Sequence, residues 1–212
     1  PRKGGLSLRL DLVFERSYNS RDTYTGPLGQ GWTHNYNTQL WFETGRVVWL
    51  SPRGARLGFT ANGGGSFTPE TGIRATLAFA QNTYTLTQGD NLVYTFNQTG
   101  TLTSVRTGLG HTTTLSYTNG NLTHIQGADG RALTLTYDDH RRIKTIQDPI
   151  SRTAIFTYTD NALTAYRDPS GQVWSYTYDG SRLTALTAPN GGVLSHGYDD
   201  RMRVITQTNP LS

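Results

Sequence analysis

The chain has 212 residues, a formal net charge of +4 and a sequence pI near 9.4. No cysteine is present, which excludes a disulfide framework and a thiolate zinc site. No apolar stretch approaches the ~20 residues that a membrane helix requires, so no membrane segment is predicted. The arginines are spread along the chain rather than clustered, and we therefore predict no nucleic-acid partner.

The residue types favour strands and turns. The sequence contains 34 Thr, 12 Tyr and 24 Gly, while only 16% of its residues are charged. Threonine and aromatic residues prefer extended backbone, and glycine supplies tight turns. We therefore predict an all-β chain with a surface built mainly from uncharged polar side chains.

The first 95 residues show no fixed repeat and are predicted to form an irregular β segment. Two stretches rich in aromatic and polar residues stand out, at 14–22 and 26–36. The sequences at 51–54 and 63–67 contain Pro and Gly combinations that predict hairpin turns. We expect the chain to divide into this segment, 1–95, and a repeat region, 96–212.

The repeat region carries an aromatic residue at a spacing of 20 or 21 residues. Its positions are Phe96, Tyr117, Tyr137, Tyr158, Tyr178 and Tyr198. A fixed period in this range indicates a stack of similar structural units.

Each repeat has the same order of residue types. Apolar and polar residues alternate before the aromatic residue, as in Leu133, Leu135 and Tyr137 against Thr134 and Thr136. An aliphatic residue follows five or six positions later, and a turn with Gly or Ser comes after that. Alternation bounded by turn residues predicts strands, so each repeat is predicted to be two short strands. The repeats together predict a continuous antiparallel hairpin meander with the tyrosines holding neighbouring hairpins together.

Three repeats begin with Tyr-Asp, at 137–138, 178–179 and 198–199, and therefore resemble the YD repeats of the Rhs (rearrangement hotspot) family. The stretches 14–22 and 26–36 resemble the start of an Rhs core. This resemblance implies a hollow β-sheet shell, of which the chain would be the beginning, with about five repeats forming a curved strip. In bacterial members the shell encloses a C-terminal toxin domain that is delivered by type VI secretion or by insecticidal toxin complexes.

The resemblance therefore implies a non-catalytic fragment of a toxin-encapsulating shell. Its partners would be the rest of the shell and the enclosed toxin, and its location would be secreted or at the cell surface, although no signal peptide is visible. The Tyr-bearing face would line the cavity. Two open sheet edges also predict self-association.

A second hypothesis is a cell-surface adhesion module, because animal teneurins use a similar shell as an adhesion receptor. Such a module would recognise glycans or a protein partner. The candidate stacking platforms for sugars are Trp32, Trp41, Trp49 and Trp174.

We predict no catalytic, cofactor-binding or metal-binding residue, and no cofactor. The histidines are His34, His111, His124, His140 and His196, and none has a partner at metal-ligand spacing. Asp148-Pro149 and Asp168-Pro169 lie nearest to the Asp-Pro-x-Gly-Leu cleavage motif of the family, but they lack Gly-Leu and are predicted to be ordinary turns. The pairs Asp138-Asp139 and Asp199-Asp200 are predicted to be solvated turn residues rather than calcium ligands.

Overall fold

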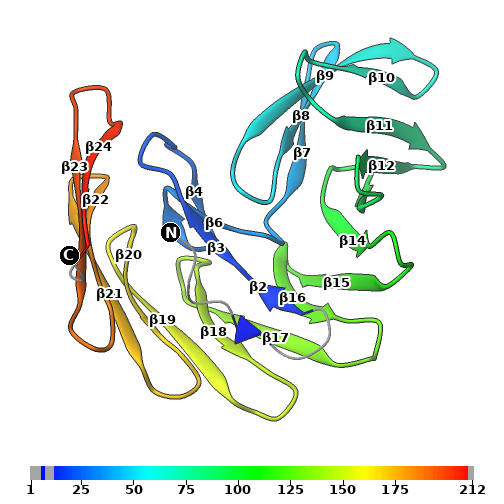
Figure 1. The fold of residues 1–212 in the computed structure, drawn as a ribbon. Helices are drawn as coiled ribbons and strands as arrows, with labels where there is room; N and C mark the ends of the chain where they lie inside the picture. The colour runs from blue at the N-terminus through cyan, green and yellow to red at the C-terminus, as the bar shows by residue number, and fades with distance from the viewer. Residues whose placement is uncertain (1–5, 8–11, 210–212) are drawn as a thin grey trace. The chain divides into compact units, whose positions relative to one another are not determined.

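The computed structural model describes residues 6–7 and 12–209, in which all regular secondary structure is β (Figure 1). This part of the chain contains no helix long and apolar enough to span a membrane. Two compact units can be separated. Unit 1 contains residues 17–33 and 134–209, and unit 2 contains residues 6–7, 12–16 and 34–133 of the described chain.

Short strands dominate the N-terminal part. These are β1 (Leu6–Ser7), β2 (Val13–Phe14), β3 (Arg16–Tyr18), β4 (Thr25–Gly26), β5 (Gly29–Gln30) and β6 (Trp32–His34). Strand β1 pairs with β2, and β4 pairs with β5, in both cases antiparallel.

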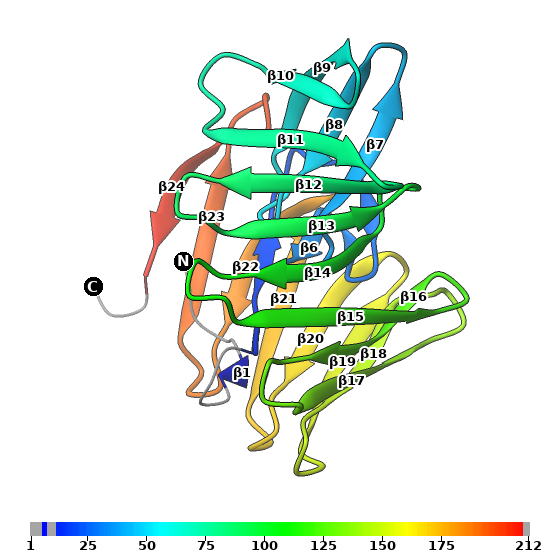
Figure 2. The ribbon, with the colours of Figure 1, turned by 90° about the vertical axis from the view of Figure 1, so that its right-hand side faces the viewer.

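Unit 2 is built mainly from strands β7 to β16, which pair antiparallel in chain order; Figure 2 shows β11 to β15 as successive rows of this sheet. Their bounds are β7 (Gln39–Glu43), β8 (Arg46–Leu50), β9 (Arg56–Gly63), β10 (Ser66–Pro69), β11 (Ala75–Ala80), β12 (Thr83–Gln88), β13 (Val93–Asn97), β14 (Leu102–Arg106), β15 (Thr112–Thr118) and β16 (Asn121–Gln126).

Unit 1 contains the later hairpins, which also pair antiparallel in chain order. Their strands are β17 (Ala132–Tyr137), β18 (Ile143–Gln147), β19 (Thr153–Thr159), β20 (Ala162–Arg167), β21 (Val173–Asp179), β22 (Arg182–Thr187), β23 (Val193–Tyr198) and β24 (Val204–Thr208). Strands β7 to β24 thus follow one another as an antiparallel meander that is not closed. The predicted all-β hairpin meander is confirmed.

Alternating residues bury one face of each sheet, as the sequence pattern predicts. In β17, Leu133 and Leu135 are buried while Thr136 is exposed. The aliphatic residue after each aromatic position except Tyr198 is also buried, as Ile143 and Leu163 show with no exposed surface, whereas Val204 after Tyr198 is exposed. Burying such a side chain contributes roughly 1.5–3 kcal/mol, so this face supplies the main stabilisation of the hairpins.

A β-bulge precedes every aromatic repeat position, and the sequence pattern alone does not reveal it. In the β17–β18 hairpin, Leu135 pairs with Ile146, Thr136 pairs with Thr145, and Tyr137 then pairs with Ile143. The register shift lets Lys144 stand without a direct partner. The same shift precedes the other aromatic positions, at Phe96, Tyr117, Tyr158, Tyr178 and Tyr198. It explains why the two aliphatic residues of a repeat are three positions apart rather than the two of a regular strand.

Threonine hydroxyls stabilise several of these bulges. Thr164 donates a hydrogen bond of 3.2 Å to the carbonyl of Thr157, and Thr184 donates one of 3.1 Å to the carbonyl of Thr177. Each acceptor lies directly before the repeat tyrosine. The bond therefore satisfies a carbonyl at a point where the bulge disrupts the ladder.

The turn between repeats requires a left-handed backbone at one position. Gly171 has a φ of 86° in the turn after β20, and Ser151 has a φ of 65° at the equivalent place after β18. Both backbone amides donate to the Asp carbonyl three residues earlier, at 3.0 Å. A side chain on such a backbone costs roughly 1–2 kcal/mol, so Ser151 is strained where Gly171 is not.

We expect Ser151→Gly to raise the free energy of unfolding by about 0.5–1 kcal/mol, because relief of this strain exceeds the entropy cost of glycine. Urea denaturation measures the change. Ser170→Gly is the matched control, since Ser170 lies in the next turn without a positive φ. The control is expected to leave stability unchanged or to lower it, and a Ser151→Gly variant no more stable than the parent would contradict the account.

Candidate functional site

Residues 17–33, here called the docking segment, lie against the hairpin ends of unit 1 through backbone contacts. The Ile143 amide donates to the Pro27 carbonyl, and the Gln30 amide donates to the Asn161 carbonyl, both at 2.8 Å. Gly29, with a φ of 85°, permits this approach because an added Cβ would lie 2.4 Å from the Asn161 carbonyl oxygen. Leu28 is fully buried beneath the contact. The glycine therefore serves both a tight turn and a close backbone approach.

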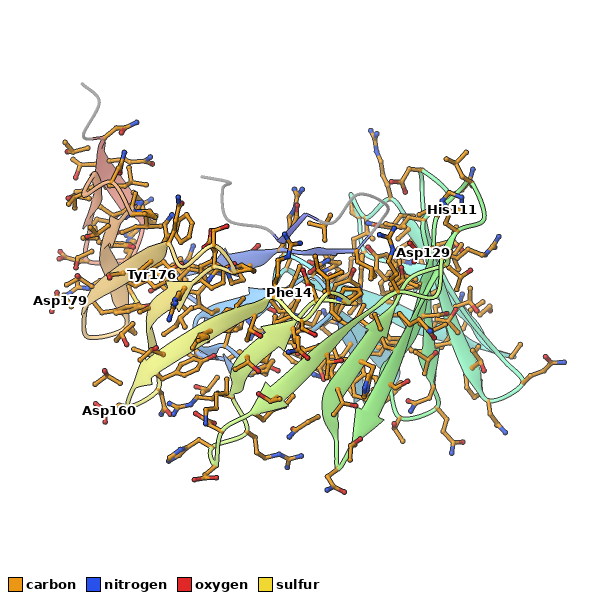
Figure 3. The ribbon with its side chains drawn as sticks, turned by 90° about the horizontal axis from the view of Figure 1, so that it is seen from below. Phe14, His111, Asp129, Asp160, Tyr176 and Asp179 are labelled. Carbon is orange, nitrogen blue, oxygen red and sulfur yellow. The ribbon has the colours of Figure 1, made fainter. Side chains whose placement is uncertain are left out.

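Aromatic rings fix the next part of the docking segment. The Trp32 ring meets Tyr176 edge-on at 5.0 Å between centroids, and Tyr18 lies 5.3 Å from Trp32. The Trp32 indole also donates a hydrogen bond of 2.8 Å to the Tyr178 hydroxyl. Figure 3 shows Tyr176 on the face of the sheet, whereas Asp160 and Asp179 lie at the ends of their hairpins.

The repeat tyrosines of unit 1 fasten each hairpin to the one before it, and we call this series the tyrosine seam. Its hydroxyls donate to main-chain carbonyls fifteen residues earlier: Tyr158 to Ile143 at 2.8 Å, Tyr178 to Leu163 at 2.7 Å, and Tyr198 to Leu183 at 2.8 Å. Each acceptor residue pairs with the preceding aromatic position across its own bulge. The predicted role of the tyrosines as links between hairpins is therefore present here as a repeating hydrogen bond.

Tyr18 inserts into the tyrosine seam from the docking segment. Its hydroxyl accepts a hydrogen bond of 3.0 Å from the Leu183 amide and donates to the Ser181 carbonyl. Burial raises the pKa of Tyr18 to about 12, against the opposing effect of the Leu183 amide. Burial likewise raises the pKa of Tyr178 well above its usual range, although the Trp32 hydrogen bond lowers it. Both hydroxyls are therefore neutral hydrogen-bonding groups at physiological pH.

The Asp residues at repeat turns organise the turn backbone. Asp148 Oδ1 accepts hydrogen bonds from the Ile150 and Arg152 amides, at 3.0 and 2.9 Å. Arg152 Nε donates to Oδ2 of the same carboxylate at 2.7 Å. Equivalent pairs join Arg142 to Asp138 and Arg203 to Asp199. In two of the three Tyr-Asp motifs, those with Asp138 and Asp199, the Asp thus closes a turn and the Arg four residues later braces it, whereas Asp179 pairs with Arg182 three residues later.

These contacts keep the turn carboxylates ionised. Burial opposes ionisation of Asp148, but the hydrogen bonds from Arg152 and the turn amides outweigh it, and its pKa lies below the usual value. Asp138 is similar. Burial would raise its pKa, but the hydrogen bonds and the charge of Arg142 outweigh that effect, so the pKa of Asp138 also lies below the usual value. The resulting stability is present above the unfolded-state pKa and is lost as pH falls through the folded-state value.

In unit 2, the N-terminal residues pack around a buried histidine. His34 is 1% exposed and its ring stacks on Phe14, with 4.7 Å between centroids. Asn35 connects the two stretches, because its side chain accepts from the Glu15 amide at 3.0 Å and donates to the Val13 carbonyl at 2.8 Å. Burial lowers the pKa of His34 to about 3, so the ring is neutral at physiological pH. The predicted packing role of His34 is consistent with this environment.

The other candidate residues are dispersed. His111, His124 and His140 are exposed, and His196 is half-buried with its Nδ1 unbonded within the described part of the chain. Residues 6–7 and 12–209 contain no group of three His, Cys, Asp or Glu side chains that could hold a metal ion.

The four tryptophans differ in their exposure. Trp32 and Trp49 are buried, at 6% and 1% exposure, so neither presents a ring face to a sugar. Trp41 and Trp174 are half-buried, and the Arg56 guanidinium lies over the Trp41 ring.

Sequence reasoning did not single out the residues that support the aromatic positions. The alternation places threonines on the polar face of a strand, and the arginines are spread along the chain without clustering. A signal existed in both cases. Thr recurs one residue after the aliphatic position, and Arg recurs four residues after Asp138, Asp148 and Asp199.

The repeating hairpins and their tyrosine seam define a YD-repeat protein. A family model described as "Teneurin YD-shell" matches residues 77–210, and one described as "Domain of unknown function (DUF6531)" matches residues 5–59. The chain therefore belongs to the teneurin YD-shell family, and its predicted identity as an Rhs/YD-repeat protein is confirmed. Neither match begins or ends near residue 95, so the division into an irregular segment, 1–95, and a repeat region, 96–212, stays a prediction.

Solved structures give weaker similarity. A porin-like protein from Bacteroides uniformis is 14% identical, with a TM-score of 0.39, over 81% of this chain and 92% of that one. The Photorhabdus luminescens Tc holotoxin pore is 15% identical, with a TM-score of 0.39, over 84% of this chain. The match spans only 10% of that toxin chain. No curated protein matches the sequence.

We expect acid to destabilise unit 2 through His34. Because its pKa is about 3 when folded and near 6.5 when unfolded, stability is complete above pH 6.5 and falls as pH drops toward 3. The slope approaches about 1.4 kcal/mol per pH unit. Denaturation of the parent, His34→Gln and the exposed-site control His124→Gln between pH 4 and 7 measures it. His34→Gln should flatten the slope while His124→Gln retains it, and equal slopes in the parent and His34→Gln would refute the assignment.

Proposed function

We propose that this chain is a non-catalytic segment of a larger β-shell that encloses a C-terminal toxin domain and delivers it. Membership of the YD-shell family supports a structural shell role. The observation that carries the proposal is the tyrosine seam, because each hydroxyl bonds to the preceding hairpin. The linkage therefore extends with every added repeat. Each added repeat contributes one hairpin to the sheet, and that hairpin is stabilised by its neighbour, as in other repeat proteins.

The docking segment suits the start of such a wall. It contacts successive hairpins of unit 1 at Ile143, Asn161, Leu183 and Met202. One short stretch thereby joins several repeats that otherwise touch only their neighbours. In this proposal the segment holds the repeats of unit 1 in place, the aromatic face lines the cavity, and the protein acts outside the cell or at its surface.

The test uses the full-length parent protein and limited proteolysis. The region after the repeats is expected to resist protease while the shell is intact. Gly29→Ala is expected to expose it, because the added Cβ would collide with the Asn161 carbonyl. Gly45→Ala is the matched control, since Gly45 also has a positive φ but no atom within 4 Å of the added Cβ. A region after the repeats that is cleaved as rapidly as a free domain would overturn encapsulation.

We also propose that the isolated chain self-associates through strand β24. This strand pairs with β23, and its other edge has no pairing within the described part of the chain. Val204 and Ile205 are 49% and 63% exposed. An open edge with apolar side chains favours pairing with a second copy.

Sedimentation velocity tests the self-association. Ile205→Lys is expected to reduce it, because a lysine on an edge strand disfavours pairing. Ile150→Lys is the control, since Ile150 is similarly exposed, at 69%, but lies in a turn. A parent chain that stays monomeric at high concentration would disprove the proposal.

The adhesion alternative has less support. Two of the four tryptophans proposed as sugar platforms are buried, and the half-buried Trp41 carries Arg56 over its ring. Saturable binding on a glycan array would favour adhesion over encapsulation.

A further inference from the structure

Unit 2 contains a cavity of about 230 Å³ that the shell role does not use. Its walls come from β2, from the stretch that follows β6, and from strands β13 to β15; they include Val13, Tyr36, Tyr94, Val105, Thr107 and Thr113. Ala128, in the turn after β16, is exposed at its margin. Figure 3 shows His111, another lining residue, and Asp129 on turns at this end of the unit.

Two hydroxyl-bearing residues of the wall lack internal partners. Tyr94 is only 5% exposed, yet its hydroxyl has no hydrogen bond to any residue that the structure describes. Thr107 Oγ1 is also buried without a hydrogen-bond partner in the described chain. Buried hydroxyls in folded proteins are normally bonded, so the unbonded Thr107 hydroxyl, in a wall that also contains Tyr94, indicates a place for a bonding ligand.

The lining residues restrict the charge of such a ligand. They include no Asp, Glu, Lys or Arg, so no carboxylate, ammonium or guanidinium group of the lining would pair with a charged ligand. Burial raises the pKa of Tyr94 to about 12, with Asp90 adding to the effect and Arg53 opposing it. The hydroxyl therefore stays protonated, able to donate or accept one hydrogen bond, and the fitting ligand is neutral.

Size and shape restrict the ligand further. The volume lies below the roughly 300–1,000 Å³ typical of drug-sized ligands, so the occupant is small. The rings of Tyr36 and Tyr94 and the side chains of Val13 and Val105 offer apolar and aromatic walls. A sugar carries more hydroxyl groups than the two unpaired protein hydroxyls can satisfy, whereas an aromatic ring with one polar group matches both features.

We propose that this cavity binds a neutral aromatic group of phenol or indole size that hydrogen-bonds to the Tyr94 hydroxyl. The site is independent of the shell proposal, since all the residues that carry it lie in unit 2. The aromatic group is supplied either by a free small molecule or by a Tyr or Trp side chain of a peptide. The chemistry at Tyr94 is the same for both sources.

The test is a titration of the ¹⁵N-labelled chain with phenol and with toluene, followed by amide chemical shifts. Phenol is expected to bind saturably at millimolar concentration and to shift the Val13, Val105 and Thr113 amides. Tyr94→Phe keeps the ring but removes the hydroxyl, so phenol should bind about three- to tenfold more weakly while toluene is unchanged. Tyr84→Phe is the matched control, because Tyr84 packs against Phe79 and does not line the cavity.

A second variant keeps the test decisive if Tyr94→Phe folds poorly. Ala128→Phe places a ring at the exposed margin of the cavity and should abolish phenol binding without disturbing the buried wall. Titration with N-acetyl-tyrosine-methylamide separates the two sources, since its binding indicates a peptide side chain and its failure beside bound phenol indicates a free molecule. Absence of saturable phenol binding, shifts that map elsewhere, or affinities unchanged by both variants would overturn the proposal.

Discussion

The hydrogen bond from each repeat tyrosine to the main chain of the preceding hairpin is the interaction on which unit 1 depends. The acceptor carbonyl, fifteen residues earlier, belongs to the residue that pairs with the preceding aromatic position directly beyond a β-bulge, as Leu163 does for Tyr178. The bulge in turn leaves a carbonyl that a threonine hydroxyl satisfies, as Thr184 does for Thr177. Tyrosine and bulge therefore recur together along unit 1, and a threonine hydroxyl adds to them where the bulged residue is Thr, as at Thr164 and Thr184.

The docking segment adds long-range order to this local device. Hairpins that bond only to their neighbours gain stability pairwise, whereas Tyr18 and Trp32 bring residues 17–33 onto strands more than 140 positions away. Such contacts carry a large loop-closure cost, because distant segments must meet before the contact contributes. Gly29 is a critical position for the same reason, since a side chain there would block the backbone approach to Asn161.

Much of the repeat could be predicted from the order of residue types. The alternation of Leu133, Thr134 and Leu135 predicts the strand and its buried face. The Gly or Ser that follows the second strand of a repeat, such as Ser151 or Gly171, predicts the turn. The absence of any clustered His or Asp pattern gave no candidate for catalysis. The cavity beside Tyr94 could not be predicted, because its walls come from residues 13, 36, 94, 105 and 113, which no local pattern connects.

The sequence by itself determined the strand class, the period of the repeat and the family, since these depend on residue order within about twenty positions. Only the tertiary structure decided what the tyrosines bond to, where the docking segment lies and which aspartates are braced by arginine. The acceptors of the tyrosine hydroxyls lie beside bulges, each of which shifts the strand register by one residue and has no counterpart in the residue pattern. The docking segment is held largely through backbone groups, which every residue carries and which the sequence therefore does not distinguish.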